Sequence, residues 1–265
     1  MGAPPPRPVH VSYATANFSQ AARILRRSAR RFGLDTRIYG PDGPVAAGLR
    51  ARHPAVMSAK RGAGYWLWKP FIILDAMNTV PDGTAVLYTD IALSFIADPA
   101  PLLALAARNP ICLFGRAVYG PQRIWTKRDC FVELDADTPE FWNLPQLWAG
   151  MQLYRAGPEA RVFLGKLCEA MANEAALTDK PNIHGLPDLP SLREHRHDQS
   201  ILTILAHREG VTIFPDPSQF GGWEVQPPDT PFRQIFHLHR KRDTHLPNLF
   251  WRQLRGVYTG GRGFA

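Results

Sequence analysis

The first forty residues contain a strand, a helix and a second strand, and this order constrains the fold more than any other feature. Residues 9–14 (VHVSYA) have the composition of a short strand. Ser19 is expected to begin a helix with one apolar face, Gly33 to end it, and residues 34–39 to form the next strand. Strands joined through a helix pair in parallel and need helices on the sheet faces. The opening therefore predicts an α/β protein.

The rest of the chain continues this pattern. Apolar blocks predict strands at residues 84–88, 111–114, 147–154 and 211–214, and helical patterns cover residues 70–77, 99–107, 159–176 and 199–207. Residues 45–59 have the polar composition of a loop. We expect one domain over residues 9–245, with a Rossmann-like, mostly parallel central sheet flanked by helices. A flexible start (residues 1–8) precedes it and a basic tail (residues 246–265) follows.

Composition excludes several classes of protein. With 265 residues, of which 45% are hydrophobic, the chain can bury one substantial core. It has no apolar run near the roughly 18 residues of a membrane span and no apolar stretch of a secretory signal, so a cytoplasmic protein is expected. The 3 cysteines are widely spaced, which favours reduced thiols in the core over a zinc site or a disulfide framework.

Positive charge is concentrated at the end of the chain. The net charge is +8, and the 33 residues from Arg233 onward hold seven Lys or Arg and one acid. Such a stretch attracts nucleic acid, anionic lipid or a nucleotide diphosphate. No nucleic-acid-binding signature accompanies it, so a nucleic-acid partner is not expected. Apolar residues within 249–254 lie beside arginines, so this segment either rests on an anionic membrane, at its inner face, or docks on the domain.

Acids and histidines stand at the ends of predicted elements. Asp90 follows the buried strand at 84–88, where ligands of open α/β sheets collect, although it would equally cap the next helix. Asp198 and Gln199 begin a buried helix, a position that serves either as a cap or as the wall of a cleft. His237 and His239 have the i, i+2 spacing that puts two rings on one face of a strand.

Several strings together carry a resemblance. GYWLWKP (residues 64–70), Tyr88-Thr89-Asp90, Ala149-Gly150, HRHDQS (195–200) and HLHR (237–240) occur in the order found in a group of bacterial glycosyltransferase-like proteins of polysaccharide biosynthesis. Over residues 9–240 the chain resembles a nucleotide-diphospho-sugar transferase of the GT-A fold. GYWLWKP and HRHDQS are the unusual strings, whereas a strand that ends in aspartate is common.

The resemblance implies a glycosyltransferase that moves a sugar from a nucleotide-diphosphate donor to a hydroxyl of a saccharide or lipid-linked acceptor in cell-surface polysaccharide synthesis. It also implies a divalent cation, Mn²⁺ or Mg²⁺, held by Asp90 with His237 and His239. The family pattern has a second acid where this chain has Ala92. The diphosphate is therefore neutralised either by a cation completed by phosphate and water, or directly by Lys60, Arg61 and Lys69. The missing acid also leaves open a degenerate protein that binds a sugar or nucleotide without turnover.

Further site residues follow from the same resemblance. Asp198 is the candidate general base of an inverting reaction, and Gln199 would contact the sugar face in a retaining one. The nucleotide base is expected on the end of the first strand, at Tyr13, Ala14 and Thr15. Aromatic residues of GYWLWKP, namely Tyr65, Trp66 and Trp68, are candidates to line the sugar pocket, although such residues also suit a core. His195 and His197 either point at the cleft or are solvent-facing or structural.

Overall fold

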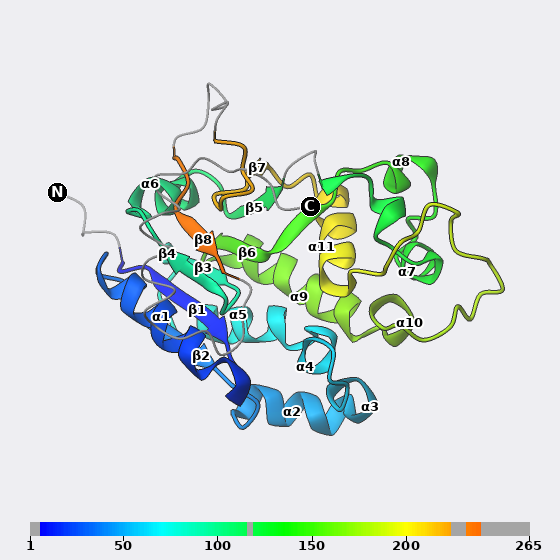
Figure 1. Ribbon diagram of the computed structural model, residues 1–265, viewed down its shortest axis with the longest axis horizontal. Coiled ribbons are helices and arrows are strands. Elements are labelled where there is room, and N and C mark those ends of the chain that lie inside the picture. Colours follow the sequence, from blue (N-terminus) through cyan, green and yellow to red (C-terminus); the bar gives the residue numbers. More distant parts are fainter. Residues whose placement is uncertain (1–5, 116–118, 224–231, 240–265) are drawn as a thin grey trace.

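The computed structural model describes residues 6–115, 119–223 and 232–239. These residues form a six-stranded sheet in the order β2-β1-β3-β6-β5-β7 (Figure 1). Its strands are β1 (Val9–Tyr13), β2 (Thr36–Tyr39), β3 (Ala85–Thr89), β5 (Ile111–Gly115), β6 (Leu147–Arg155) and β7 (Ile213–Pro215). Every neighbouring pair is parallel except the two that involve β6, which runs against β3 and β5. The predicted α/β class and mostly parallel sheet are confirmed.

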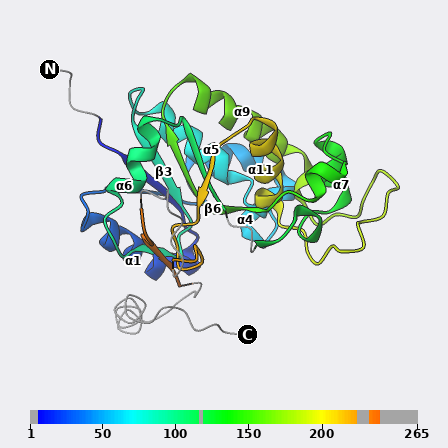
Figure 2. The same ribbon diagram turned by 90° about the horizontal axis from the view of Figure 1, so that it is seen from above.

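Helices cover both faces of this sheet. On one face α5 (Trp68–Asn78), α9 (Pro158–Ala172) and α11 (His197–Arg208) pack on the apolar side chains of β1, β3 and β6. On the other face lie α1 (Ser19–Arg30) and α6 (Ala100–Leu103), and Figure 2 shows α1 and α9 on opposite sides of the strands. Burial from both sides explains why the side chains of β1 and β3 are almost all buried along their length.

The remaining helices are short and depart from the sequence prediction. Residues 45–59 are not a loop, because α2 (Pro44–Arg52) and α3 (Pro54–Met57) occupy them. The helix predicted to reach residue 176 ends at Ala172, where Asn173 accepts hydrogen bonds from Ala175 and Ala176 and begins α10 (Glu174–Leu177). The others are α4 (Gly62–Tyr65), α7 (Arg128–Glu133), α8 (Pro139–Trp142), and 3₁₀ turns at Ala16–Phe18, Ala104–Ala107 and Gln122–Ile124.

A two-stranded ribbon brings the late histidines toward the end of β3. It pairs β4 (Leu93–Phe95) with β8 (Phe236–Leu238), antiparallel, with His237 opposite Ser94. These two residues are 143 positions apart in the sequence. His239 follows β8, and its backbone N donates to the carbonyl of Ala92 at 3.0 Å. The late histidines thus join the segment that directly follows Asp90.

Two further expectations concern the chain as a whole. Cys112, Cys130 and Cys168 are buried and form no disulfide, which confirms the prediction of thiols in the core. Within the described residues no helix has both the length and the apolar composition that crossing a membrane requires. The predicted basic tail at residues 246–265 and its membrane contact lie outside the described residues, as do residues 1–5 of the predicted flexible start.

Candidate active site

The candidate site forms where β3 ends and β6 begins. Because β6 is antiparallel to β3, the first residues of β6 lie beside the C-terminal end of β3, which Asp90 directly follows. The backbone N of Asp90 donates to the carbonyl of Gly150 at 2.8 Å. The start of α5 supplies Lys69 to this edge, and the start of α11 supplies Asp198. Three segments far apart in the sequence therefore place their charged side chains at one point.

Lys69 lies between the two acids. Its Nζ is 2.5 Å from Asp198 Oδ2 and 3.5 Å from Asp90 Oδ1, and it donates to the carbonyl of Ala149 at 3.2 Å. The Lys69 side chain is 3% exposed, whereas that of Asp90 is 33% exposed. Tyr88 donates its hydroxyl to the same Asp90 Oδ1 at 2.7 Å. One buried cation thus fixes two carboxylates, of which Asp90 has the greater access to solvent.

The pKa shifts follow from this burial. Desolvation alone would lower the pKa of Lys69, but the nearby carboxylates of Asp198 and Asp90 outweigh it and raise the pKa, so Lys69 stays an ammonium at neutral pH. Burial raises the pKa of Asp198, and the charge of Lys69 opposes that rise. A carboxylate with a raised pKa beside a fixed cation is typical of a group that takes up a proton during a reaction.

A pocket of about 270 Å³ opens over these groups. The residues of the predicted site and motifs that line it are Arg61, Trp66, Lys69, Asp90, Ala149, Gly150, His197, Asp198 and Gln199. Its wall is completed by Arg196, from the HRHDQS string, and by Trp148 and Glu194, for which the sequence predicted no role in the site. The GYWLWKP string at residues 64–70 and the HRHDQS string at residues 195–200 therefore meet here in space. Their meeting supports the expectation that both belong to one site.

Trp148 lies across Gly150. A Cβ on Gly150 would meet Nε1 of the Trp148 indole at 2.4 Å and Cε2 at 2.5 Å, so only glycine leaves room for the ring. The two residues share one side of β6 because side chains alternate along a strand. The indole packs on the core with its other atoms and faces the pocket beside Asp90. The signal in the sequence was the i, i+2 spacing of tryptophan and glycine, which has this meaning only once the strand is placed.

A left-handed turn places Tyr65 and Trp66. The φ angles of the five consecutive residues 62–66 are 57°, 51°, 100°, 52° and 59°. Backbone hydrogen bonds from Tyr65 to Arg61 (2.8 Å) and from Trp66 to Gly62 (3.2 Å) close the turn. Left-handed backbone costs about 1–2 kcal/mol for each residue with a side chain. Such a turn therefore requires support from its surroundings, and it directly precedes Lys69.

His197 supplies part of that support. Its ring lies 4.9 Å from the ring of Tyr65 and 5.7 Å from that of Trp66, measured between centroids. Nδ1 donates to the carbonyl of Leu177 at 2.8 Å, and burial lowers the pKa of His197, so the ring is neutral with its proton on Nδ1. His197 itself has a left-handed φ of 47°. It lines the pocket with a buried ring, while His195, bonded to the carbonyl of Ala176, belongs to the interior.

The lining of the pocket around Lys69 does not include Tyr13, Lys60, Tyr65 or Trp68, for which ligand contacts were predicted. The rings of Tyr13 and Trp68 stack on each other at 3.9 Å and are 5% and 4% exposed, so both belong to the core and offer little surface to a base or a sugar. Lys60 is exposed and does not line the pocket around Lys69. Ala14 and Thr15 are half-buried at the end of β1, and the register of β1 with β3 puts this end level with Asp90.

The residues near Asp90 fit a cation only in part. Among the described residues, no group of three or more His, Cys, Asp or Glu side chains is arranged to hold a metal ion. Asp90 supplies a carboxylate, Ala92 supplies no ligand, and His239 is joined to the Ala92 backbone. This donor set suits an ion that takes its other ligands from phosphate and water, as Mg²⁺ and Mn²⁺ commonly do.

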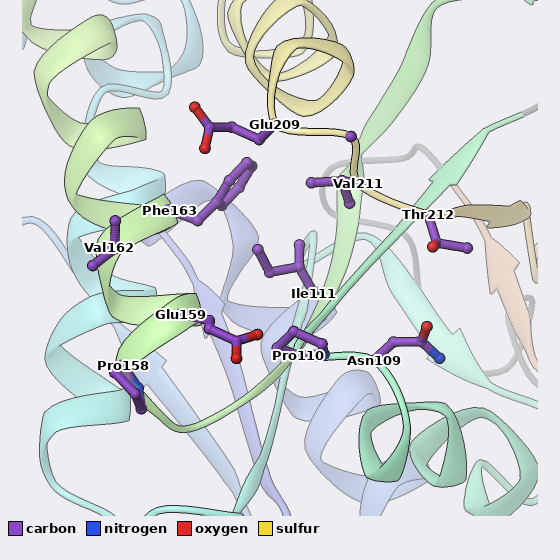
Figure 3. A pocket seen from close by; sticks show the side chains of 11 residues that line it. Asn109, Pro110, Ile111, Pro158, Glu159, Val162, Phe163, Glu209, Val211 and Thr212 are labelled. Carbon is purple, nitrogen blue, oxygen red and sulfur yellow. The ribbon is translucent and has the colours of Figure 1, made fainter.

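A second pocket, of about 500 Å³, lies at the opposite end of the strands, where β5 begins (Figure 3). Ile111, Phe163 and Val211 give it an apolar floor, with the carboxylates of Glu159 and Glu209 at its rim. Its lining includes none of the predicted site residues and no Lys or Arg. The charged residues in that lining are both acids, which would repel an anionic ligand, so the smaller pocket over Lys69 is the candidate site.

Comparison with known proteins identifies the fold. No protein-family model and no curated protein matches the sequence. The solved structure of an active-site variant of LgtC, in which glutamate replaces a glutamine, is similar over 94% of this chain and 95% of that one, with a TM-score of 0.51 and 12% identity.

Two further structures are similar. The bifunctional glycosyltransferase WbbM gives a TM-score of 0.52 at 12% identity, over 90% of this chain and 46% of that one. A glycosyltransferase involved in glycosylation of the major capsid of PBCV-1 gives 0.50 at 11% identity, over 89% of this chain and 96% of that one. At identities this low, the similarity shows the fold alone. The chain has the α/β architecture of the GT-A glycosyltransferases.

Proposed function

We propose that the protein is a glycosyltransferase that moves a sugar from a nucleotide-diphosphate donor to a hydroxyl of a saccharide or lipid-linked acceptor in cell-surface polysaccharide synthesis. It would act in the cytoplasm, at the inner face of the membrane where the acceptor is lipid-linked. The observation that carries the proposal is the buried Lys69 held between Asp90 and Asp198 in a pocket of a GT-A fold.

Asp198 is the proposed general base. In transfer with inversion, the acceptor oxygen forms a bond to the anomeric carbon, the bond from that carbon to the diphosphate oxygen breaks, and the acceptor proton passes to Asp198. Lys69 keeps Asp198 ionised beforehand and fixes its position. If the product has the inverted anomeric configuration, Asp198 is assigned this role. A product of retained configuration assigns Gln199, which lines the same pocket, as the group that faces the reacting carbon.

The leaving diphosphate needs positive charge that is free to meet it. Lys69 is already neutralised by two carboxylates, so its proposed role is to hold them and not to bind phosphate. Arg61 lines the pocket, its side chain is 45% exposed, and its ion pairs within the described part of the chain are long contacts of 3.7 Å with Asp179 and Glu194. A bound Mn²⁺ or Mg²⁺ would neutralise the departing diphosphate, and Asp90 with His239 or His237 would hold it.

Two indoles make the pocket suitable for a sugar ring. Trp66 and Trp148 both line it, together with the oxygens of Asp90, Asp198 and Gln199. A pyranose has a C–H face that packs on an aromatic ring and an edge of hydroxyls that needs hydrogen-bond partners. The two indoles can pack on the C–H face, and the charged and polar side chains that make up most of the lining can bond to the hydroxyls.

A thermal-shift panel tests the proposal. Nucleoside diphosphates and their sugar conjugates are added to the full chain, each with Mn²⁺, Mg²⁺ or EDTA, and the Tm is measured. We expect one nucleotide series to raise the Tm, because a ligand that binds only the folded state stabilises it. The sugar conjugate that binds is then assayed for turnover, which separates an enzyme from a degenerate binding protein. A Tm that no nucleotide changes under any of these conditions would contradict the proposal.

A further inference from the structure

Two buried glutamines behind the pocket are joined to Gln199. Gln122 and Gln146 are both 0% exposed. An antiparallel bridge between Pro121 and Pro145 sets them side by side, with backbone bonds from Gln122 to Leu144 (2.8 Å) and from Gln146 to Gly120 (3.0 Å). Gln199 Nε2 then donates to Gln146 Oε1 at 2.8 Å, so the chain of amides reaches the pocket wall.

The hydrogen bond at the far end of this series of amides fixes which way each amide is turned. Gln122 lies against the backbone carbonyl of Ser200, at 2.9 Å, and a carbonyl only accepts, so Gln122 must present its Nε2 there. Its Oε1 therefore points the other way and accepts from Gln146 Nε2 at 3.2 Å and from Thr126 Oγ1 at 3.1 Å. Gln146 in turn must present its Oε1 to Gln199, which must donate.

The orientation of Gln199 follows. With its nitrogen bonded to Gln146, its oxygen accepts from the backbone N of Ala149 at 3.4 Å, and the residue lines the pocket beside Asp198. A flipped amide would put the oxygens of Gln199 and Gln146 against each other and leave a buried acceptor without its donor, which costs about 1–3 kcal/mol. The amide is therefore held in one of its two orientations.

We propose that Gln146 and Gln122 are positioning residues for the reaction. They hold the Gln199 amide so that its oxygen, and not its NH₂ group, faces the sugar. A carboxamide oxygen accepts a hydrogen bond from a sugar hydroxyl and stabilises positive charge that develops at the reacting carbon. This inference rests on the proposed function, because it concerns a sugar in the pocket of Asp198.

A double-mutant cycle tests this inference. Gln146→Met, Gln199→Ala and the double variant are compared for kcat and KM of donor turnover and for the Kd of the nucleoside diphosphate. Gln146→Met removes the oxygen that accepts from Gln199 Nε2 and keeps the side-chain volume nearly constant. Because the Gln199 amide is then free to turn, we expect kcat to fall about tenfold with the nucleotide Kd unchanged. In the Gln199→Ala background the same change should lower kcat less than about twofold, since Gln146 acts only through Gln199.

Thr126→Val is the matched control. Thr126 is also fully buried, and its hydroxyl is bonded to Gln122 Oε1. When this hydroxyl is removed, the Ser200 carbonyl still holds Gln122 Nε2, so the orientation of the amides is kept. This variant should keep the wild-type kcat. Losses that multiply independently in the double variant, or an unchanged kcat in Gln146→Met, would overturn the inference.

The wild-type protein supplies a second readout in case Gln146→Met does not fold. In a structure with the nucleotide sugar bound, a sugar hydroxyl or the reacting carbon should lie within about 3.5 Å of Gln199 Oε1. A sugar bonded to Gln199 Nε2 would overturn the inference. Failure of the wild type to bind or turn over any nucleotide sugar would instead contradict the proposed function itself.

Discussion

At the scale of single residues, Lys69 is the group on which the site depends. Its ammonium is almost fully buried, and the charges of Asp90 and Asp198 compensate the loss of hydration. Removal of one partner of a buried ion pair leaves the other charge without compensation, which is why the effect of a substitution here should exceed that of any surface ion pair.

Lys69→Met should therefore alter both stability and pH dependence. We expect the free energy of unfolding to fall by about 3–5 kcal/mol. Because the charge of Lys69 lowers the pKa of Asp198, its loss should raise that pKa further and move the acid limb of the pH–rate profile to higher pH. Chemical denaturation and a pH–rate profile measure the two effects.

Lys166→Met is the control for that substitution. Lys166 forms an exposed pair with Glu209 at 2.7 Å, outside the pocket, and such pairs contribute about 0–1 kcal/mol. Its loss should leave the pH–rate profile in place. An acid limb that does not move in Lys69→Met would mean that Asp198 is not the group that the profile reports.

Gly150→Ala tests the position of Trp148. The new methyl group would lie 2.4 Å from the indole nitrogen, so the ring must leave its place across the strand. We expect weaker binding of the nucleotide sugar, by about tenfold, with little change for the nucleoside diphosphate alone, because the indole is proposed to contact only the sugar. Isothermal titration measures both affinities, and equal losses for the two ligands would contradict this role of Trp148.

At the scale of elements, the strands were the most predictable part of the fold. Apolar blocks at 84–88, 111–114 and 147–154, bounded by proline and glycine, became β3, β5 and β6 within one or two residues. The direction of β6 could not be predicted, since strand pattern does not distinguish parallel from antiparallel pairing. The helix α2 was missed because only Ala46 and Leu49 are buried in it, which leaves almost no apolar periodicity to detect.

The candidate site was predictable only in part. Asp90 and Asp198 follow from their places at element ends, but Trp148 reaches the pocket only because β6 runs antiparallel and starts at its edge. A ligand role was expected for Tyr13 and Trp68 because the sequence does not reveal that their rings stack on each other. The left-handed turn before Lys69 had no sequence signal beyond its two glycines.

That turn predicts the effect of a small substitution. A Cβ on Gly62 would meet the Trp66 indole at 2.4 Å, at a φ of +57° that disfavours any side chain. Gly62→Ala should lower the free energy of unfolding by about 2 kcal/mol or more and weaken donor binding, since Trp66 would leave the pocket wall. Chemical denaturation with titration of the nucleotide sugar measures both effects.

Gly48→Ala is the matched glycine control. Gly48 lies within α2, where a Cβ would have nothing within 4 Å and the φ is not left-handed. Alanine is favoured there, so this variant should be about 0.5–1 kcal/mol more stable and should bind the donor normally. Equal stability losses at the two glycines would mean that the left-handed turn does not need Gly62.

At the scale of the whole molecule, the buried histidines should make the fold sensitive to acid. Burial lowers the pKa of His10 to about 3, and its ring bonds to Thr36 and Thr89 at 2.9 Å and 2.8 Å. The unfolded chain takes up this proton near pH 6.5 while the folded chain does not, so stability is lost as the pH falls from 6.5 toward 3. Burial lowers the pKa of His195 as well and adds to the same trend.

His10→Gln should reduce this sensitivity, because an amide can bond to both hydroxyls but does not titrate. Between pH 7 and pH 5, His10 should account for about 2 kcal/mol of the loss in the free energy of unfolding, and the variant should lack that share. Urea denaturation at the two pH values measures it. An unchanged difference between them would mean that His10 is protonated in the folded protein.

The central claim, that Asp90 and Asp198 act on one nucleotide sugar, is tested most directly by turnover and donor affinity in Asp90→Asn and Asp198→Asn. Asp90 faces the solvent side of the pocket and Asp198 lies on Lys69, so their losses should differ. Asp90→Asn should mainly raise the Kd of the donor, and Asp198→Asn should lower kcat about a hundredfold or more with a nearly unchanged Kd. Near-normal turnover in both folded variants would contradict the account.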